Sequence, residues 1–376
     1  MKEDSKRGFV VHGVPAKGCL YCVKGEKLVL FITGLCVQKC FYCPVSEQKF
    51  GNDATYANEW QIKNKEELVE EVKLTDARGA GITGGDPLVE LDKTCEYIKF
   101  LKNKFGEKFH IHLYTPFQLV TENSMSKLYE AGLDEIRFHP NIDNNTGWDK
   151  IKFANKYAWD VGLEIPCLPN KEKETKKMID FFADKIKFIN LNELECSDTT
   201  IKHYNLDEYK TKDDSSYGIE NSKETAIEII KYVEKKHPDV TAYFCSAYLK
   251  DKTQMGKRIL KRAQNVAKNY DIITEEGMLI RACAYLEELK PGINYRENLS
   301  KVNKKEIIIK LEEAKKIIYK KLNIKQIDLD EDKLRLTFSS RKAKGLAEKI
   351  KMLGLAVAIV EEYPTKDATE IEIEFL

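Results

Sequence analysis

Three cysteines directly after an apolar run constrain this chain more than any other feature. Cys36, Cys40 and Cys43 form a C-x3-C-x2-C pattern, and they follow the run LVLFI at residues 28–32. A cubane iron–sulfur cluster normally takes four thiolates, so three cysteines on one loop hold three of its irons and leave the fourth open. The pattern therefore predicts a [4Fe–4S] cluster with one reactive iron. The alternative is three unrelated buried cysteines, or a zinc site that uses a fourth residue elsewhere.

The first half of the chain alternates short apolar runs with longer amphipathic segments, the pattern of parallel βα units rather than hairpins. Six strands are predicted, at Lys27–Thr33, Gly79–Thr83, Phe109–Tyr114, Glu135–His139, Leu163–Leu168 and Phe188–Leu194. They predict an α/β fold, a partial (β/α)6 TIM-type barrel. The tail changes to a β-α-β-β order, which predicts a small C-terminal α+β module.

The chain is therefore expected to divide into four parts. They are an N-terminal metal-knuckle segment at 1–26, the barrel at 27–200, a flanking segment with a basic helix at 201–302, and the α+β module at 303–376. Within the flanking segment, Thr200–Asn221 has no clean period and is predicted to be a long loop across the open face of the barrel.

A second motif follows the second predicted strand. Gly84, Gly85, Asp86 and Pro87 form a GGDP sequence, which alone would be an ordinary turn because Gly and Pro are common in loops. In a parallel barrel the loops after the strands meet at the carboxyl-end mouth, where such folds place their active sites. The GGDP turn and the cysteine loop are therefore expected to face one site.

These two motifs resemble those of the radical S-adenosylmethionine (SAM) superfamily. The cysteine loop carries an aromatic residue, Tyr42, before its last cysteine, and GGDP stands where that superfamily has GGEP. The resemblance covers residues 27–200 and is strongest to an archaeal group related to pyruvate formate-lyase activating enzyme, with Tyr56–Glu59 and Asn190–Glu195 as shared traits. Asp86 departs from the common Glu by one methylene and keeps the charge.

The resemblance implies two cofactors, a [4Fe–4S] cluster on the three cysteines and SAM at its open iron. It also implies that Gly84, Gly85 and Asp86 supply backbone and carboxylate contacts to an ammonium group on the substrate side of the site. Tyr42 is implied to lie near the adenine of SAM. Reduction by an external donor of the ferredoxin or flavodoxin type would yield a 5′-deoxyadenosyl radical. The implied activity is that of a radical SAM oxidoreductase that modifies or activates an RNA or a protein.

Cys19 and Cys22 form a C-x2-C pair upstream of the first strand. Such a pair is expected in a turn that presents two thiolates to one metal, either an auxiliary iron–sulfur cluster or zinc. Cys245, on an expected strand at Val240–Cys245, is the best candidate for a third ligand, and Cys283 and Cys196 are weaker ones. The alternative is that these thiols are free or merely buried.

Polar side chains are expected inside the barrel because residues two apart on a strand share a face. His110 and His112 share one face, and Arg137 and His139 share a face of the next strand. Structural histidines are the competing interpretation. A buried guanidinium needs a carboxylate or a substrate group as partner, so Arg137 is a candidate catalytic residue.

The last predicted barrel strand ends in a polar group that includes Asn192, Glu193 and Glu195. Glu193 is a second candidate catalytic residue, on the substrate side. Alternation along a strand places Glu193 and Glu195 on one face and Asn192 on the other, so the three are not expected to face the interior together.

A basic stretch at 250–262 carries Arg258 and Arg262 four residues apart on one helical face. This pair would clamp phosphates or a nucleic-acid backbone. The alternative is a solvated lysine-rich helix. The stretch has no interleaved aromatic residues, so base stacking is not indicated.

Composition limits the setting in which the chain works. With 62 Lys and Arg against 61 Asp and Glu the chain is not a general polyanion binder, and ten cysteines without a secretory signal indicate metal or redox chemistry. No apolar stretch approaches the roughly 18 residues of a membrane span, so a cytoplasmic protein without a membrane partner is expected. The alternative to an enzyme is a non-catalytic iron–sulfur electron carrier or a zinc-binding module.

Overall fold

The computed structural model describes residues 1–197, 209–212 and 217–376, so most of the predicted loop at Thr200–Asn221 lies outside the described residues. The chain divides into two compact units, Met1–Arg258 and Ile259–Leu376. This division falls inside the predicted flanking segment 201–302, so that segment contributes to both units.

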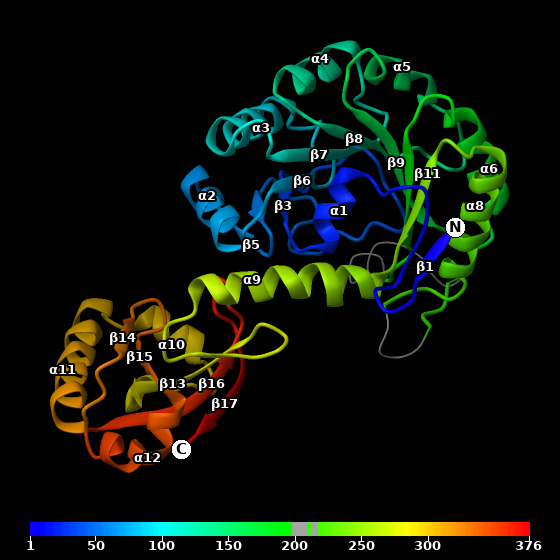
Figure 1. The fold of residues 1–376 in the computed structure, drawn as a ribbon. Coiled ribbons are helices and arrows are strands. Elements are labelled where there is room, and N and C mark those ends of the chain that lie inside the picture. Colours follow the sequence, from blue (N-terminus) through cyan, green and yellow to red (C-terminus); the bar gives the residue numbers. More distant parts are fainter. Residues whose placement is uncertain (198–208, 213–216) are drawn as a thin grey trace. The chain divides into compact units, whose positions relative to one another are not determined.

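The first unit is a partial (β/α)6 TIM-type barrel (Figure 1). Its parallel strands are β3 (Lys27–Phe31), β6 (Gly79–Thr83), β7 (His110–Thr115), β8 (Glu135–Phe138), β9 (Asp160–Cys167), β10 (Phe188–Glu193) and β11 (Thr241–Cys245). They pair in that order, each parallel to the next. The first six match the six predicted strands to within a few residues, and β11 adds the expected strand near Cys245.

Short antiparallel strands complete both edges of this sheet. β4 (Tyr56–Ala57) and β5 (Trp60–Gln61) continue it beyond β3. At the other edge, β2 (Phe9–His12) pairs with β11, and β1 (Lys2–Asp4) pairs with β2. The N-terminal segment is therefore built into the barrel sheet.

Helices on the convex side of the sheet cover its apolar face (Figure 1). They are α2 (Lys65–Leu74), α3 (Leu91–Phe105), α4 (Glu122–Glu130), η1 (Trp148–Lys150), α5 (Ile151–Ala154), α6 (Glu172–Phe182) and α8 (Ser222–Lys236). Local sequence sets several of their ends: the Asn64 side chain accepts from Glu67 N ahead of α2, and Thr121 and Ser124 form a capping box on α4.

One helix lies on the concave side instead. α1 (Lys17–Val23) sits within the curve of the sheet and packs on β3, β6 and β7 (Figure 1). Gly18 makes this position possible, because a Cβ there would lie 2.5 Å from Arg137 Nη2 and 2.5 Å from His112 Nδ1. The predicted turn at Cys19 and Cys22 is thus a helix that fills the amino end of the barrel.

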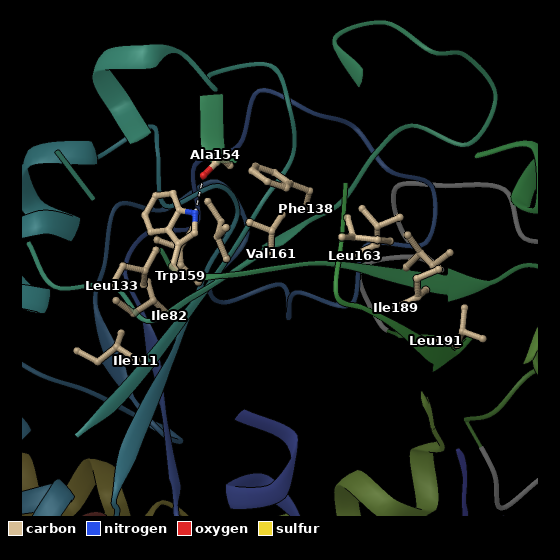
Figure 2. Close-up of a cluster of buried hydrophobic side chains, with 14 of the residues drawn as sticks. Ile82, Ile111, Leu133, Phe138, Ala154, Trp159, Val161, Leu163, Ile189 and Leu191 are labelled. Carbon is tan, nitrogen blue, oxygen red and sulfur yellow. Dashed lines mark hydrogen bonds between the residues drawn. The ribbon is translucent and has the colours of Figure 1, made fainter. Parts of the chain in front are cut away.

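The two faces of the parallel strands differ in chemistry. Apolar side chains such as Ile82, Leu163 and Ile189 line the face that the outer helices cover, and Trp159 Nε1 donates to Ala154 O there at 2.8 Å (Figure 2). The opposite face carries Lys27, His110, His112, Glu135, Arg137, Glu164 and Asn190, all but Glu164 buried. TIM-type barrels normally fill this interior with branched apolar residues, so a polar interior marks a functional cavity.

The second unit is a six-stranded antiparallel sheet with helices. Its strands are β12 (Ile272–Ile273), β13 (Leu279–Leu286), β14 (Ile327–Asp330), β15 (Arg335–Phe338), β16 (Leu355–Glu362) and β17 (Glu370–Phe375). Its helices are η3 (Glu287–Leu289), α10 (Tyr295–Lys301), α11 (Lys304–Leu322) and α12 (Ser340–Lys351). The predicted α+β module is present, but its central strand β13 lies before the predicted start at 303.

A π-helix, η2 (Leu249–Met255), runs into α9 (Gly256–Val266), which crosses the division between the units. The π-helix directs Lys250 and Gln254 toward the barrel interior, in keeping with the tendency of such segments to occur at functional sites. Among the described helices, none has the length and apolar character needed to cross a bilayer.

Candidate functional site

A cavity of about 450 Å³ occupies the barrel interior. Its lining at the carboxyl end of the strands includes Cys36, Cys40, Cys43, Gly84 and Gly85, and its lining at the amino end includes Cys19, Cys22 and Lys27. The structure therefore brings the cysteine loop and the GGDP turn to the same mouth, as predicted, and joins that mouth to the C-x2-C pair through one continuous space.

The GGDP turn is hydrogen-bonded to the start of the cysteine loop. Gly85 N donates to Thr33 O at 2.8 Å, and Asp86 N donates to Leu35 O at 2.8 Å. A Cβ on Gly85 would lie 2.2 Å from Leu35 O, and one on Gly84 would lie 2.5 Å from Thr33 O. Both glycines are therefore required by close backbone approach, and they form a cradle beside the three cysteines.

The three cysteines are near one another without yet forming a metal cage. Cys36 is exposed, Cys40 and Cys43 are half-buried, and Gln38 N donates to Cys36 Sγ at 3.4 Å. Burial, reinforced by the neighbouring Cys36, raises the pKa of Cys40 to about 12. No group of three or more His, Cys, Asp or Glu among the described residues is arranged to hold a metal ion. The donor set fits an iron–sulfur cluster chemically, and binding would require deprotonation and closure of the loop.

Tyr42 is fixed by His139, the residue directly after the fourth barrel strand, β8. His139 Nδ1 lies 2.8 Å from Glu164 O, and a carbonyl only accepts, so Nδ1 carries a proton. Burial lowers the pKa of His139, so the ring is neutral and its Nε2 accepts from Tyr42 OH at 2.8 Å. The cysteine loop is thereby tied to β8 and β9 across the mouth of the cavity.

Asp86 points into the protein rather than into the cavity. It is fully buried, and its Oδ1 accepts from Leu88 N at 3.0 Å and from Thr115 Oγ1 at 2.9 Å. Burial raises the pKa of this carboxyl to about 6. In this arrangement the Asp86 carboxylate holds the turn through Oδ1. The predicted contact to a cofactor ammonium would need its other oxygen, Oδ2, which has no partner among the described residues.

Arg137 is buried between two carboxylates. Its Nε donates to Glu135 Oε1 at 2.6 Å and its Nη1 donates to Glu164 Oε2 at 2.9 Å. Its remaining N–H groups face Glu135, Tyr114 OH at 3.2 Å and Cys19 Sγ at 3.5 Å. All five N–H groups of the guanidinium are therefore committed, which leaves none for a substrate.

Glu193, the other predicted catalytic residue, lines the cavity but is also paired. It forms an ion pair with Lys212, and its Oε2 accepts from Ala247 N at 2.8 Å. Asn192 and Glu195 line the same cavity, so the expectation that the three cannot share it is wrong. Glu193 is the last residue of β10 and Glu195 lies beyond it, so these two carboxylates meet the cavity at the end of the strand rather than across its inner face.

Cys19, Cys22 and Cys245 all line the cavity, and, as for the cysteine loop, the described residues show no arranged metal cage there. Cys19 Sγ accepts from Asn190 Nδ2 at 3.3 Å, and Cys245 Sγ accepts from Gln254 Nε2 at 3.5 Å. Burial raises the pKa of all three thiols. Cys283 lies in the second unit and Cys196 follows β10, so neither of these weaker candidates completes a site among the described residues.

The predicted arginine clamp is not exposed. Arg258 forms an ion pair with Glu59, and its side chain is only 11% exposed. Arg262 is buried. The helix α9 therefore does not present the two guanidinium groups together to solvent, and the alternative of an exposed lysine-rich face accounts for its remaining charges.

Several cavity residues went unnoticed in the sequence. Glu164 accepts from Asn190 Nδ2 and from Asn192 Nδ2, both at 2.8 Å, and so lies at the centre of the polar interior. Tyr243 and Lys250 also line the cavity. The available signal was a charged residue at an inward position of an otherwise apolar strand, as in VGLEIP at 161–166.

Known proteins similar to this chain point to one family. A profile described as the radical SAM superfamily matches residues 30–182. A protein of Methanocaldococcus jannaschii, whose name provisionally describes it as a glycyl-radical enzyme activating enzyme, is 39% identical over 369 residues, which cover 95% of this chain and 91% of that protein.

Solved structures are more distant. Streptococcus suis SuiB bound to its precursor peptide SuiA is 14% identical with a TM-score of 0.43, and the match covers 60% of this chain and 49% of SuiB. Methylornithine synthase is 13% identical with a TM-score of 0.39, and the match covers 58% of this chain and 70% of that enzyme. The chain thus spans about half the length of SuiB. The profile match and the 39% identical relative, which agree with the cysteine loop and the barrel, lead to one conclusion: the chain belongs to the radical SAM superfamily, whose enzymes use a [4Fe–4S] cluster and SAM.

Proposed function

We propose that Cys36, Cys40 and Cys43 hold the [4Fe–4S] cluster and that the cavity behind them binds SAM and the substrate. When bound, the reduced cluster supplies the electron that cleaves SAM to methionine and a 5′-deoxyadenosyl radical. The observation that carries the proposal is that the three thiols and the Gly84–Gly85 cradle line one cavity at the carboxyl ends of parallel strands. That is where barrel enzymes keep their reactive groups.

The chain's own residues bind, orient and exclude water in this proposal. The Gly84 and Gly85 backbone, free of side chains, lies open beside the cluster loop, where it accommodates the amino acid end of SAM. Tyr42, held by His139, is positioned for the adenine. Arg137 and Glu193 act as positioning residues, since the hydrogen bonds described above commit them to other protein groups.

The proposal includes a reducing setting and an external partner. A one-electron donor of the ferredoxin or flavodoxin type would dock near the exposed Cys36. An oxygen-labile cluster fits a cytoplasmic location. The name of the Methanocaldococcus relative favours a second candidate for the downstream step, formation of a glycyl radical on a partner protein. The buried arginines of α9 give no support to RNA as the substrate.

The experiment that tests the proposed function is SAM cleavage by the purified protein. We expect anaerobically reconstituted and reduced protein to convert SAM to 5′-deoxyadenosine and methionine in equal amounts, measured by liquid chromatography. An electron carrier would be reduced and reoxidised without consuming SAM. Reduction of a fully loaded cluster with no 5′-deoxyadenosine would overturn the proposal.

Gly85→Ala should disable the cluster loop without touching a ligand. The added methyl group would meet Leu35 O at 2.2 Å, so the loop must shift away from the turn. We expect cluster retention to fall by roughly 10–100-fold, the usual effect of losing support around a metal ligand. Iron content after reconstitution measures this. Gly345→Ala is the control, because a Cβ there meets nothing within 4 Å, and equal iron loss in both variants would contradict the argument.

A further inference from the structure

The part of the cavity outside the cysteine loop and the GGDP turn has the properties of a ligand site in its own right. We call it the inner chamber; it is lined by Cys19, Cys22, Glu164, Asn190, Tyr243 and Cys245. We propose that the inner chamber binds a small substrate through an amino group carried by that substrate. The proposal rests on the proposed function, because it assigns a substrate class to the same cavity.

The inner chamber is closed at the amino end of the barrel. α1 packs on β3, β6 and β7, and Gly18 N donates to Glu135 Oε2 at 3.2 Å beneath the sheet interior. A volume of about 450 Å³ for the whole cavity lies within the roughly 300–1,000 Å³ of small-molecule sites. This floor leaves the mouth of the barrel as the way in, and a cavity of this size fits a small molecule.

Two buried polar groups of the chamber have no hydrogen-bond partner among the described residues. Asn190 is 1% exposed, and its Nδ2 must face Glu164 because a carboxylate only accepts. Its Oδ1 is therefore an acceptor without a donor, and Tyr243 OH is likewise unpaired. A buried polar atom without a partner is destabilising, so both positions indicate a ligand that brings hydrogen-bond donors.

The charge of the chamber also favours a donor that is cationic. Arg137 is shared by Glu135 and Glu164, so one cation faces two carboxylates. The nearby Lys250 is paired with Glu195. Lys27 is hydrogen-bonded to His110, and burial lowers the pKa of Lys27 to about 7. Lys27 is therefore only partly protonated at neutral pH and only partly neutralises the negative charge of Glu135.

Glu164 is the group that would meet the ligand. Its side chain is 16% exposed and already accepts from Arg137, Asn190 and Asn192. A carboxylate has about four lone-pair sites, so one acceptor position is left for the ligand. Asn190, which is hydrogen-bonded to Glu164 from the neighbouring strand, adds its unpaired Oδ1 as a second acceptor for the same ligand.

Two of the chamber's three cysteines, Cys22 and Cys245, make the proposal testable without knowing the substrate. The probes are 2-aminoethyl methanethiosulfonate, a cation, and 2-sulfonatoethyl methanethiosulfonate, an anion. The rates at which the two reagents label Cys22 and Cys245 are followed by peptide mass spectrometry. For each cysteine, the rate with the cationic reagent is divided by the rate with the anionic reagent, and this ratio is divided by the same ratio measured with glutathione. Because both reagents attack the same thiol, its thiolate fraction cancels from the ratio.

We expect this normalised ratio to be on the order of tenfold or more in the wild-type chain, since a charged cleft concentrates ions of opposite sign. Glu164→Gln should bring it close to one. Glu71→Gln is the matched control, because Glu71 is a buried carboxylate on α2 that does not line the cavity, and it should leave the ratio unchanged. If Glu164→Gln fails to fold, the wild-type ratio alone decides.

Three results would overturn the proposal. A wild-type ratio near one would remove the cation preference. Labelling of Cys22 by a maleimide with a long polyethylene glycol chain as fast as by N-ethylmaleimide would show a chamber open to polymers, as a protein substrate requires. Complete protection of Cys22 by SAM would assign the acceptors to the cofactor. Each result is compatible with continued 5′-deoxyadenosine formation, so failure here is distinguishable from failure of the proposed function.

Discussion

Cys40→Ala is expected to reduce 5′-deoxyadenosine formation to background. The middle cysteine of the loop is one of the three thiolates that the open-iron arrangement requires, and the remaining two cannot hold a cubane cluster in its place. The loss should be at least about 100-fold, since removing even an outer-shell partner of a metal ligand costs roughly 10–100-fold. Iron content, absorbance of the reconstituted protein and SAM cleavage measure the effect together.

The matched control is Cys95→Ala. Cys95 is a buried thiol on α3, in the hydrophobic core and outside the cavity. Its replacement removes one sulfur atom from the core and should leave iron content and cleavage unchanged. Cleavage at the wild-type rate in Cys40→Ala would mean that the cluster is held elsewhere, for example by Cys19 and Cys22.

Arg137→Met is expected to destabilise the first unit by about 3–5 kcal/mol, the usual cost of removing one partner from a buried ion pair. The guanidinium is 2% exposed and links Glu135 on β8 to Glu164 on β9, so its loss leaves two carboxylates facing each other without a cation. The midpoint of denaturant unfolding measures the change. SAM cleavage by the remaining folded protein should be much less affected.

Lys127→Met is the control for that measurement. Lys127 pairs with Asp92 at the surface, where the two side chains are 42% and 88% exposed, and such pairs contribute about 0–1 kcal/mol. An Arg137→Met protein of normal stability that fails to cleave SAM would instead restore Arg137 to the catalytic role that its position in the sequence suggested.

The barrel strands could be predicted because parallel strands are buried on both faces and therefore appear as short apolar runs. The position of GGDP relative to the cysteines followed from the same topology, since both motifs come directly after strands. Family resemblance supplied the cofactors. The inward polar residues were only partly predicted: His110, His112 and Arg137 stood out by their spacing, whereas Glu164 was a single charged residue within an apolar run.

The N-terminal segment was the main failure, and the reason is its dependence on distant parts of the chain. α1 has seven residues, too few to be stable alone, and it forms because the barrel interior accepts it. The pattern of residues 149–161 taken alone would continue α5 to Val161, but the helix stops at Ala154 because Asp160 and Val161 pair with Glu135 and Ile136 as the start of β9. In both places tertiary contacts override the local pattern.

The pairing of β2 with β11 has a consequence for the order in which the molecule is completed. The cysteine loop and the GGDP turn are close in sequence and can meet early in synthesis. β2, among the first residues to leave the ribosome, finds its partner only when nearly all of the first unit has been made. Contacts of such long sequence separation form slowly. Folding therefore finishes at this edge of the sheet, where β2 adds to β11 after the cysteine loop and the GGDP turn have met.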